Sequence, residues 1–309
     1  MTHTLLGAGG SIGIPLAIEL LQAKEKVRLV SRSGSGIPGA EPVKADLTKY
    51  REVAESVRGS DVVYLLAGLP YNSEIWERDW PVIMRNTLDA VQEAGARLIF
   101  FDNVYMYGRV SGPMTEDTPF NPCSRKGEVR ARIATMVLEE MARSPFGISI
   151  ARSADFYGPW SEKNSMPHIL VFDPLLQGRK ARWMANAKAI HSFTYTLDCA
   201  RALYRLAGNT NSFNQVWHLP TFNPPPDGRS FIAMAARELG AGSRYTVMKK
   251  GMVKIAGLFN QTISELHEML YQNEYDYYFD SSKFNRFFNY QPVSYEQGIR
   301  ETLDFLRKG

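Results

Sequence analysis

The stretch that decides the fold lies almost at the N-terminus and reads Leu5-Leu6-Gly7-Ala8-Gly9-Gly10-Ser11-Ile12-Gly13. It follows an apolar run typical of a strand and precedes a segment with helical periodicity, which is the context in which a glycine-rich turn binds a dinucleotide. Glycine lets the backbone approach a pyrophosphate, and the free N–H groups of the following helix point at the phosphates. The expected contacts to such a cofactor are Gly7, Gly9, Gly10, Ser11, Ile12 and Gly13.

Short β-rich runs then alternate with helix-length segments, which is the pattern of a parallel sheet covered by helices. The expected strands are Thr4–Leu6, Lys26–Ser31, Val62–Ala67, Arg97–Phe101 and Ile148–Ala151. The expected helices are Ile14–Ala23, Lys49–Val57, Trp80–Glu93 and Arg125–Arg143. We therefore predict an α/β protein with a Rossmann-type, doubly wound parallel sheet.

Beyond residue 160 the alternation weakens, and Pro, Met and aromatic residues become more frequent. This change indicates a smaller C-terminal lobe that binds a substrate. We expect residues 1–160 to form the nucleotide-binding domain and residues 189–215 to return to it. Residues 161–188 and 216–309 would form most of the substrate-binding lobe.

Composition excludes several other classes of protein. The formal net charge is only +4, so there is no case for a nucleic-acid surface. Cys123 and Cys199 lie far apart, without the spacing of a zinc site or a disulfide framework, and the histidines show no metal-binding spacing. No apolar run approaches the roughly 18 residues of a membrane span, and the first strand leaves no room for a signal peptide. We expect a cytoplasmic protein with a small-molecule substrate and no metal, nucleic-acid or membrane partner.

The residues after the second strand bear on which dinucleotide is bound. The strand ends in Ser31-Arg32-Ser33, where a fold that prefers NAD places an acidic residue against the ribose 2′-hydroxyl. A guanidinium flanked by two hydroxyls suits a 2′-phosphate instead. We therefore expect NADP rather than NAD, the alternative being that Arg32 is a solvated loop residue.

Two further segments are expected at the cofactor. Asp46 and Leu47 follow a third probable strand, where they could meet the adenine, although Asp46 could equally cap a helix. Ala67 and Gly68 end another strand, where small residues allow close approach of a cofactor, although Gly68 could equally be a plain loop residue.

Over nearly its whole length the sequence resembles the extended short-chain dehydrogenase/reductases, in particular their NAD-dependent epimerase/dehydratase branch. The resemblance is carried by the glycine turn, Asp46-Leu47, residues 104–108 (VYMYG), residues 152–159 (RSADFYGP), residues 191–198 (HSFTYTLD) and residues 280–283 (DSSK). It implies that Arg152 and Asp155 lie at the nicotinamide end of the cofactor. It also implies that Tyr107, His168, Arg179 and Trp183 line the substrate pocket.

The catalytic set of that family is a Ser or Thr, a Tyr that transfers a proton, and a Lys four residues after the Tyr. Here the hydroxyl position falls on Asn103, and the Tyr and Lys positions fall on Lys126 and Arg130. A shift of one helical turn would place Cys123 and Gly127 at these two positions instead, and it does not restore a tyrosine either.

The proton donor is therefore left open among several residues. Lys126 could act as an acid beside Arg130, or the two could be solvated or bind the ribose and phosphates of the cofactor. Asn103 could donate a hydrogen bond to a carbonyl but could not relay a proton. Tyr105 is an alternative phenol, and Tyr107 could be one too or simply a packed core aromatic.

The leading hypothesis is an NADP-dependent oxidoreductase or epimerase/dehydratase-like enzyme that acts on a carbonyl or hydroxyl group. Basic Arg179 and its neighbours are compatible with an anionic substrate such as a nucleotide sugar, and equally with a solvated surface. The alternative is a catalytically impaired NADP-binding sensor or regulator. The resemblance also implies a homodimer formed through the helices near Trp80–Glu93 and Arg125–Arg143.

Overall fold

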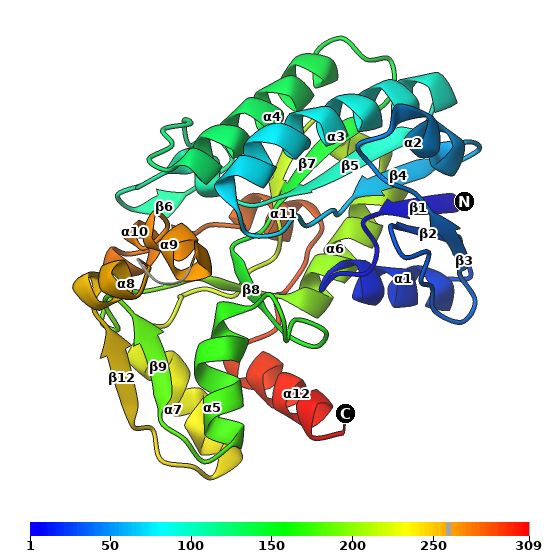
Figure 1. The fold of residues 1–309 in the computed structure, drawn as a ribbon. Coiled ribbons are helices and arrows are strands. Elements are labelled where there is room, and N and C mark those ends of the chain that lie inside the picture. The colour runs from blue at the N-terminus through cyan, green and yellow to red at the C-terminus, as the bar shows by residue number, and fades with distance from the viewer. Residues whose placement is uncertain (258–260, 309) are drawn as a thin grey trace.

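A seven-stranded parallel sheet forms the larger part of the molecule (Figure 1). The computed structural model describes residues 1–257 and 261–308. The strand order is β11-β7-β5-β4-β1-β2-β3, and every neighbouring pair is parallel. The strands are β1 (Thr2–Leu6), β2 (Lys26–Ser31), β3 (Glu41–Lys44), β4 (Val62–Leu65), β5 (Arg97–Asp102), β7 (Ile148–Arg152) and β11 (Val216–His218).

Helices cover both faces of this sheet. On one face α1 (Gly13–Gln22), α6 (Thr196–Gly208) and α11 (Ser282–Phe287) contribute apolar side chains to one core. On the other face α2 (Tyr50–Val57), α3 (Ser73–Ala94) and α4 (Arg125–Met141) contribute to a second core. Because the strands are buried on both faces, they are apolar along most of their length. The predicted doubly wound, Rossmann-type α/β fold is confirmed.

The predicted elements agree with the structure to within two residues at each end, with one exception. The helix expected at Trp80–Glu93 is wrong at its start, because α3 begins at Ser73. Asn72 caps it by accepting a hydrogen bond from the Ile75 N–H at 3.0 Å. Pro81 lies in the interior of this helix. The correction matters because Ser73 belongs to the candidate site.

The sheet also gains one strand beyond residue 215, where the nucleotide-binding domain was expected to end. β11 pairs with β7, so its residues Val216, Trp217 and His218 lie in the main sheet. α11 packs against β11, and Trp217 contacts Phe284 of that helix.

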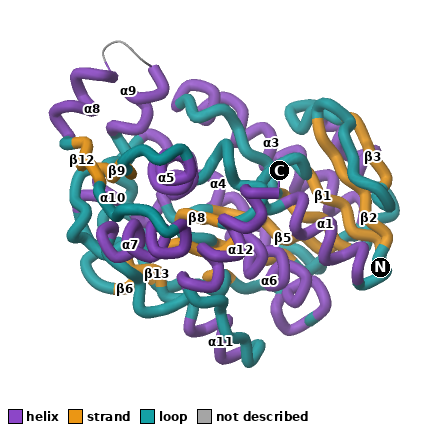
Figure 2. The backbone as a smooth tube through the Cα atoms, turned by 90° about the horizontal axis from the view of Figure 1, so that it is seen from below, coloured by secondary structure: helices purple, strands orange, loops and turns teal. Residues whose placement is uncertain are grey.

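The smaller lobe packs against the carboxyl ends of β5 and β7. Seen from below, it lies at the opposite end of the molecule from β2 and β3 (Figure 2). Its paired strands are β8 (Asp155–Tyr157) with β10 (Phe193–Tyr195), β9 (Ala181–Met184) with β12 (Tyr245–Met248), and β6 (Pro113–Met114) with β13 (Tyr278–Phe279). Its helices are α5 (Asp173–Leu176), α7 (Gly228–Leu239), α8 (Lys250–Gly257), α9 (Gln261–His267), α10 (Tyr271–Glu274) and α12 (Tyr295–Lys308). Aromatic residues dominate its core, including Phe172, Trp183, Phe231 and Tyr295.

Within the described part of the chain, none of the helices combines the length and the apolar character that crossing a bilayer requires.

Candidate functional site

The glycine turn lies where the strand order reverses, between β1 and β4. Gly7 has a φ of +85°, and a Cβ built on it would lie 2.5 Å from the Cα of Ala67, just after β4. A Cβ on Gly13 would lie 2.3 Å from the carbonyl oxygen of Ala8. Both glycines are therefore required by the close approach of backbone to backbone. In open α/β sheets this crevice is where ligands bind.

The two middle glycines of the turn face open space instead. A Cβ on Gly9 or Gly10 would meet no heavy atom within 4 Å. α1 starts directly beyond them, and its N-cap residue Ile12 makes no side-chain capping hydrogen bond. Its first turn carries no acidic residue. The turn thus combines uncovered backbone with the positive end of a helix, which is the arrangement that holds an anionic diphosphate.

The end of β2 adds one exposed cation to this cradle. Arg32 is exposed, and Ser31 and Ser33 beside it share a hydrogen bond of 3.2 Å between their hydroxyls. The carboxylate of Asp46 lies on the next strand connection and accepts from the Thr48 N–H at 3.0 Å. The pKa of Asp46 is lowered by these Thr48 hydrogen bonds, with a smaller contribution from the charge of Arg32. Asp46 thus orders the turn that leads into α2.

Of the other expected cofactor contacts, Ala67 touches Gly7 and Gly68 faces open space. Leu47 packs its side chain into the core, and its carbonyl accepts from the Asn86 amide at 3.0 Å. Ser11 and Ile12 are both buried. Only the backbone of these last three residues remains available to a ligand.

At the carboxyl ends of β5 and β7, one carboxylate lies between two arginines. Arg130 of α4 binds Asp102 through its Nε at 2.8 Å and through a second, shorter hydrogen bond. The Nε of Arg152 lies 3.6 Å from the other Asp102 oxygen. The guanidinium of Arg130 also stacks on Trp80, 4.6 Å from the ring centroid. Arg130 was expected to act in catalysis, but in this structure its side chain is only 3% exposed and its guanidinium is paired with Asp102.

A chain of hydrogen bonds continues from Arg152 into the interior. Arg152 donates to the Tyr107 hydroxyl at 2.7 Å, so that hydroxyl donates its own proton to His218 Nε2 at 2.8 Å. His218 then carries its proton on Nδ1 and donates to the Asp280 carbonyl at 2.9 Å. Burial, followed by the nearby charge of Arg152, lowers the pKa of His218 to about 3.

Two residues that were expected at the site lie in this network. Tyr107 was expected at the substrate, but it is fully buried, and burial raises its pKa to about 12. Arg152 was expected at the nicotinamide, but it is 1% exposed beneath Tyr107 and Phe120. Both side chains are part of the interior at the ends of β5 and β7, because Phe120 covers Arg152 and His218 binds the Tyr107 hydroxyl.

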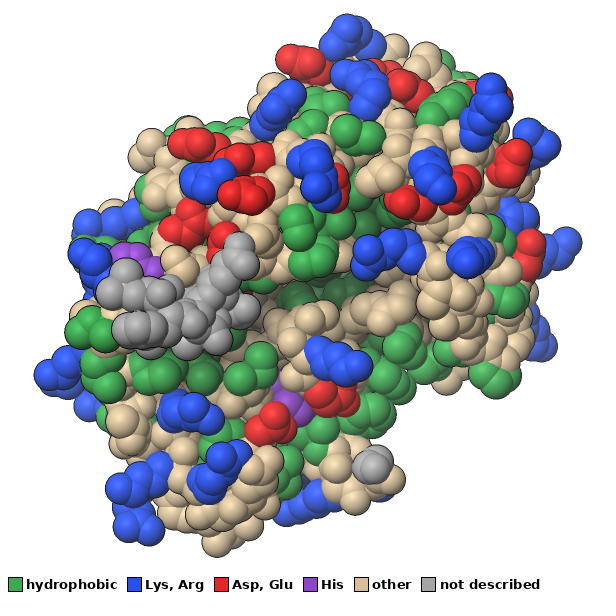
Figure 3. Space-filling view, in the orientation of Figure 1, with side chains coloured by type: hydrophobic (Ala, Val, Ile, Leu, Met, Phe, Trp, Pro, Cys, Tyr) green, Lys and Arg blue, Asp and Glu red, His purple; other side chains and the backbone are tan. Residues whose placement is uncertain are grey.

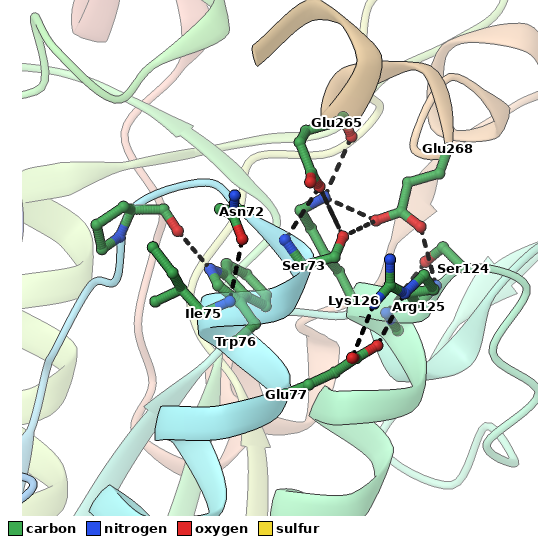
Figure 4. Close-up of polar contacts among 12 residues, drawn as sticks. Asn72, Ser73, Ile75, Trp76, Glu77, Ser124, Arg125, Lys126, Glu265 and Glu268 are labelled. Atoms are coloured by element: carbon green, nitrogen blue, oxygen red, sulfur yellow. Dashed lines mark hydrogen bonds and ion pairs between the residues drawn. The ribbon is translucent and has the colours of Figure 1, made fainter. Parts of the chain in front are cut away.

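Lys126, at the position of the family's tyrosine, is also fully buried. Its ammonium donates to the Ser73 hydroxyl at 3.1 Å and to Glu268 at 2.7 Å, and it forms a shorter bond with the Glu265 carboxylate (Figure 4). The ring of Tyr71 lies 4.5 Å from the ammonium. Although partial burial opposes it, hydrogen bonds from Lys126 and Ser73 lower the pKa of Glu265. Lys126 is therefore neither solvated nor free to contact a ligand in this state.

The other candidates at the end of β5 are partly exposed. The side-chain amide oxygen of Asn103 accepts a hydrogen bond from the Tyr105 N–H at 3.0 Å and so fixes the turn after the strand. Tyr105 stacks on Trp76 with a 6.2 Å centroid separation. Burial, followed by the charge of Asp155, raises the pKa of Tyr105 well above its ordinary value. Tyr105 is thus a protonated phenol at neutral pH.

A pocket lies within the smaller lobe, among residues of β8, β9, β10, α10 and the segment 166–170. In a space-filling view the molecule is hollowed across its middle, between its upper and lower parts (Figure 3). It is lined by Asp155, Met166, Pro167, Leu170, Trp183, Met184, Phe193 and Asn273. The carboxylate of Asp155 binds His191 Nε2 at 2.9 Å. The imidazole of His191 is stacked between Phe193 and Tyr277. Asp155 and Trp183, both expected at the site, thus meet in one pocket.

The remaining two expected substrate residues lie elsewhere in the smaller lobe. His168 is 1% exposed and pairs with Asp173 at 3.2 Å, and desolvation lowers its pKa. Arg179 is exposed in the turn between α5 and β9, where it binds Gln177. Neither residue lines the pocket described above.

Sequence reasoning missed the residues that surround Lys126 and Asp155: Ser73, Glu265, Glu268, Tyr71 and His191. Glu265 lies 139 residues after Lys126 in the chain. No local pattern connects residues so far apart. The one available signal was Asn72, a favourable N-cap residue, which could have placed Ser73 at the start of a helix.

Comparison with known proteins agrees with this geometry. The model of the NAD dependent epimerase/dehydratase family matches residues 4–218, which contain the main sheet from Thr4 of β1 to the end of β11. The chain belongs to this family. A comparison with curated proteins finds no significant match.

Solved structures of the same fold cover the whole chain. A dTDP-glucose 4,6-dehydratase from Bacillus anthracis, in complex with NAD, has a TM-score of 0.82 at 16% identity, covering 100% of this chain and 97% of that one. A UDP-glucuronic acid 4-epimerase from Bacillus cereus, with UDP-glucuronic acid and NAD, has a TM-score of 0.82 at 19% identity, covering 100% and 99%. A UDP-glucose 4-epimerase from Thermus thermophilus, with NAD, has a TM-score of 0.80 at 17% identity, covering 99% of each chain. This chain shares their fold.

Proposed function

We propose that this chain is an NADP-dependent oxidoreductase or epimerase/dehydratase-like enzyme that acts on a carbonyl or hydroxyl group. The observation that carries the proposal is the cradle formed by Gly9, Gly10 and the uncapped start of α1, with exposed Arg32 beside it. The residues fit a nicotinamide dinucleotide, because the open side of the turn accommodates a diphosphate against free N–H groups. Arg32 favours a 2′-phosphate on the ribose, although the structural neighbours carry NAD.

A bound nicotinamide would supply or accept the hydride. The residues of this chain would position the substrate and handle its proton. Asn103 lies at the end of β5, where its amide could donate a hydrogen bond, and Tyr105 beside it keeps a phenolic proton. Asp155 borders the pocket, with His191 holding its carboxylate in place.

The proposed substrate is a nucleotide sugar. Proteins of this fold act on dTDP-glucose, UDP-glucuronic acid and UDP-glucose. In this chain the pocket of the smaller lobe combines aromatic Trp183 and Phe193 with polar Asp155 and Asn273. Apolar walls with a few polar groups are typical of a site that orients a sugar ring.

The test of the proposal is cofactor binding measured by isothermal titration calorimetry with NADPH and NADH. Gly10→Val should abolish binding of both while leaving the melting temperature unchanged, because the new side chain enters open space in the free protein. Arg32→Ala should weaken the affinity for NADPH by about tenfold, because a charge-assisted hydrogen bond to the 2′-phosphate is lost. It should leave the affinity for NADH unchanged.

The matched control is Arg300→Ala, which removes an equally exposed guanidinium on α12. It should change neither affinity. If wild-type protein binds neither NADPH nor NADH, the proposed function is wrong. If it binds NADH more tightly than NADPH, the assignment of Arg32 to the 2′-phosphate is wrong.

The buried state of Lys126 favours one alternative function. A residue at the tyrosine position that is fully buried and bound by two carboxylates cannot transfer a proton to a substrate. A catalytically impaired NADP-binding sensor or regulator would keep the cradle and Arg32 without turnover. Cofactor binding without redox turnover on a panel of nucleotide sugars would favour this alternative.

A further inference from the structure

The surroundings of Lys126 form a closed polar cluster that no cofactor or substrate contact accounts for. Lys126 comes from the first turn of α4, and its two carboxylate partners come from a segment 139 and 142 residues further along the chain. The ammonium also donates to the main-chain carbonyl of Glu265 at 3.2 Å. Every direction of the ammonium is thus occupied by groups from within the chain (Figure 4).

The same carboxylates also bind the starts of two long helices. Glu265 accepts from the N–H of Ser73 at 3.1 Å and from its hydroxyl at 2.6 Å, at the first residue of α3. Glu268 accepts from the N–H of Arg125 at 2.9 Å, at the first residue of α4. Unpaired N–H groups and the helix dipole favour negative charge at both places. The two glutamates therefore occupy the places of solvent or a ligand at the Lys126 ammonium and at the N-termini of α3 and α4.

The segment that carries them is held by these contacts, by the buried side chains of Met269, Leu270 and Gln272, and by hydrogen bonds from Asn186 to the main-chain carbonyls of Asn273 and Glu274. The side chains of Glu265 and Glu268 are 13% and 22% exposed, whereas that of Lys126 is completely buried. The apolar anchors of the segment are Met269 and Leu270, which follow the two glutamates directly. A segment with few apolar anchors and partly exposed polar contacts is expected to open locally, with the rest of the fold intact.

The position of this segment connects it to the pocket. Tyr71 lies over the Lys126 ammonium, and its raised pKa reflects burial first and the nearby phenol of Tyr105 second. Asn273, which follows the glutamates on α10, lines the candidate pocket together with Asp155. The segment therefore closes over the same residues that border the candidate site.

We propose that residues 264–274 form a latch, in which Glu265 and Glu268 hold Lys126 and the starts of α3 and α4, and whose release uncovers Lys126 to a ligand. In the closed state Lys126 is withheld from chemistry. In the open state it becomes an accessible cation at the position where the family has its tyrosine. This proposal does not depend on which dinucleotide the chain binds, or on whether it binds one.

The first test measures how fast each lysine reacts with acetic anhydride, with labelling at each site quantified by mass spectrometry. In wild-type protein Lys126 should react at least about tenfold more slowly than the exposed Lys49 in the same tube, because labelling requires the latch to open. The double variant Glu265→Gln/Glu268→Gln should raise the Lys126 rate at least about tenfold and leave the Lys49 rate unchanged.

Glu274→Gln is the matched control. It makes the same chemical change on the same segment, but it releases Lys250, whose ion pair with Glu274 is largely exposed. It should leave the Lys126 rate unchanged. Should the double variant fail to fold by circular dichroism, Glu268→Gln alone removes one carboxylate and the contact to α4, and it should still accelerate Lys126. Wild-type Lys126 reacting as fast as Lys49, or a rate unaffected by the folded variants, would overturn the latch.

The second test separates a latch from a permanent structural contact. Hydrogen exchange followed by mass spectrometry should show that peptides from residues 264–274 exchange in native conditions well before those of β4 and β5. Exchange of this segment only together with the central strands would mean that it opens by global unfolding, and the latch would be refuted. A failure of NADPH to bind would disprove the proposed function but leave both results of this section unaffected.

Discussion

His218 shows how one buried side chain can make the stability of this protein depend on pH. The imidazole accepts from Tyr107 and donates to the Asp280 carbonyl, so both ring nitrogens are used only while it is neutral. If the imidazole were protonated, Nε2 would carry a proton and could no longer accept the hydrogen bond from the Tyr107 hydroxyl. The ring would also carry a positive charge near Arg152. The low pKa of about 3 follows from burial first and from that charge second.

We therefore expect acid to destabilise the fold through His218. Between the unfolded pKa of roughly 6.5 and the folded value near 3, only the unfolded chain binds the proton. The free energy of unfolding should then fall by about 1.4 kcal/mol for each pH unit below 6.5 from this residue alone. Urea denaturation of wild type and His218→Gln at pH 7, 6 and 5 measures the effect. The variant should show a shallower pH dependence, and equal slopes would contradict this account.

At the scale of elements, the ion pair between Asp102 and Arg130 connects the end of β5 to α4. Both side chains are buried, and the guanidinium is stacked on Trp80. Removing one member of a buried pair leaves the other charge without a partner, which costs more than the pair contributes.

Asp102→Ala should accordingly lower the free energy of unfolding by about 3–5 kcal/mol. The double variant Asp102→Ala/Arg130→Met should recover part of this loss, because only one of the two buried guanidiniums that face Asp102, that of Arg152, is then left without a carboxylate. Glu238→Gln, which breaks the exposed pair with Arg300, is the control and should cost less than about 1 kcal/mol. Urea denaturation of the three variants provides the measurement. A cost for Asp102→Ala as small as that of the control would show that the pair does not hold β5 to α4.

For the whole molecule, the outer faces of α3 and α4 are the surface at which we propose a homodimer. The two helices lie side by side on one face of the sheet (Figure 1). Val82 on α3 is 43% exposed and Leu138 on α4 is 36% exposed, which are large values for apolar side chains. Pairing two such helices from each copy would bury these residues.

Sedimentation analysis should show wild-type protein at twice the chain mass of 34.9 kDa. The variant Val82→Glu/Leu138→Glu should sediment as a monomer, because it would bury two carboxylates at the interface. Ile169→Glu/Leu176→Glu, which alters two exposed apolar residues of the smaller lobe, is the control and should remain a dimer. Wild-type protein that sediments as a monomer up to high concentration would rule out the proposal.

The sequence alone was sufficient to predict the parallel sheet, the glycine turn and the family. These features depend on local physics: the missing Cβ of Gly7 and Gly13, the alternation of strand and helix, and the residue types at strand ends. The sequence also predicted that the family's tyrosine is missing, since both registers that the spacing allows, one on Lys126 and the other on Cys123, place another residue there. Each of these signals is a short local motif, and the order of the motifs along the chain connects them.

Only the tertiary structure decided what the polar residues near the site do. Lys126 could have been solvated, catalytic or bound to a cofactor until Glu265 and Glu268 were placed beside it. Tyr107 and Arg152 are interior supports because distant segments cover them. Whether a charged side chain is free or paired depends on burial and on partners more than a hundred residues away, and those follow from how the chain packs rather than from any local pattern.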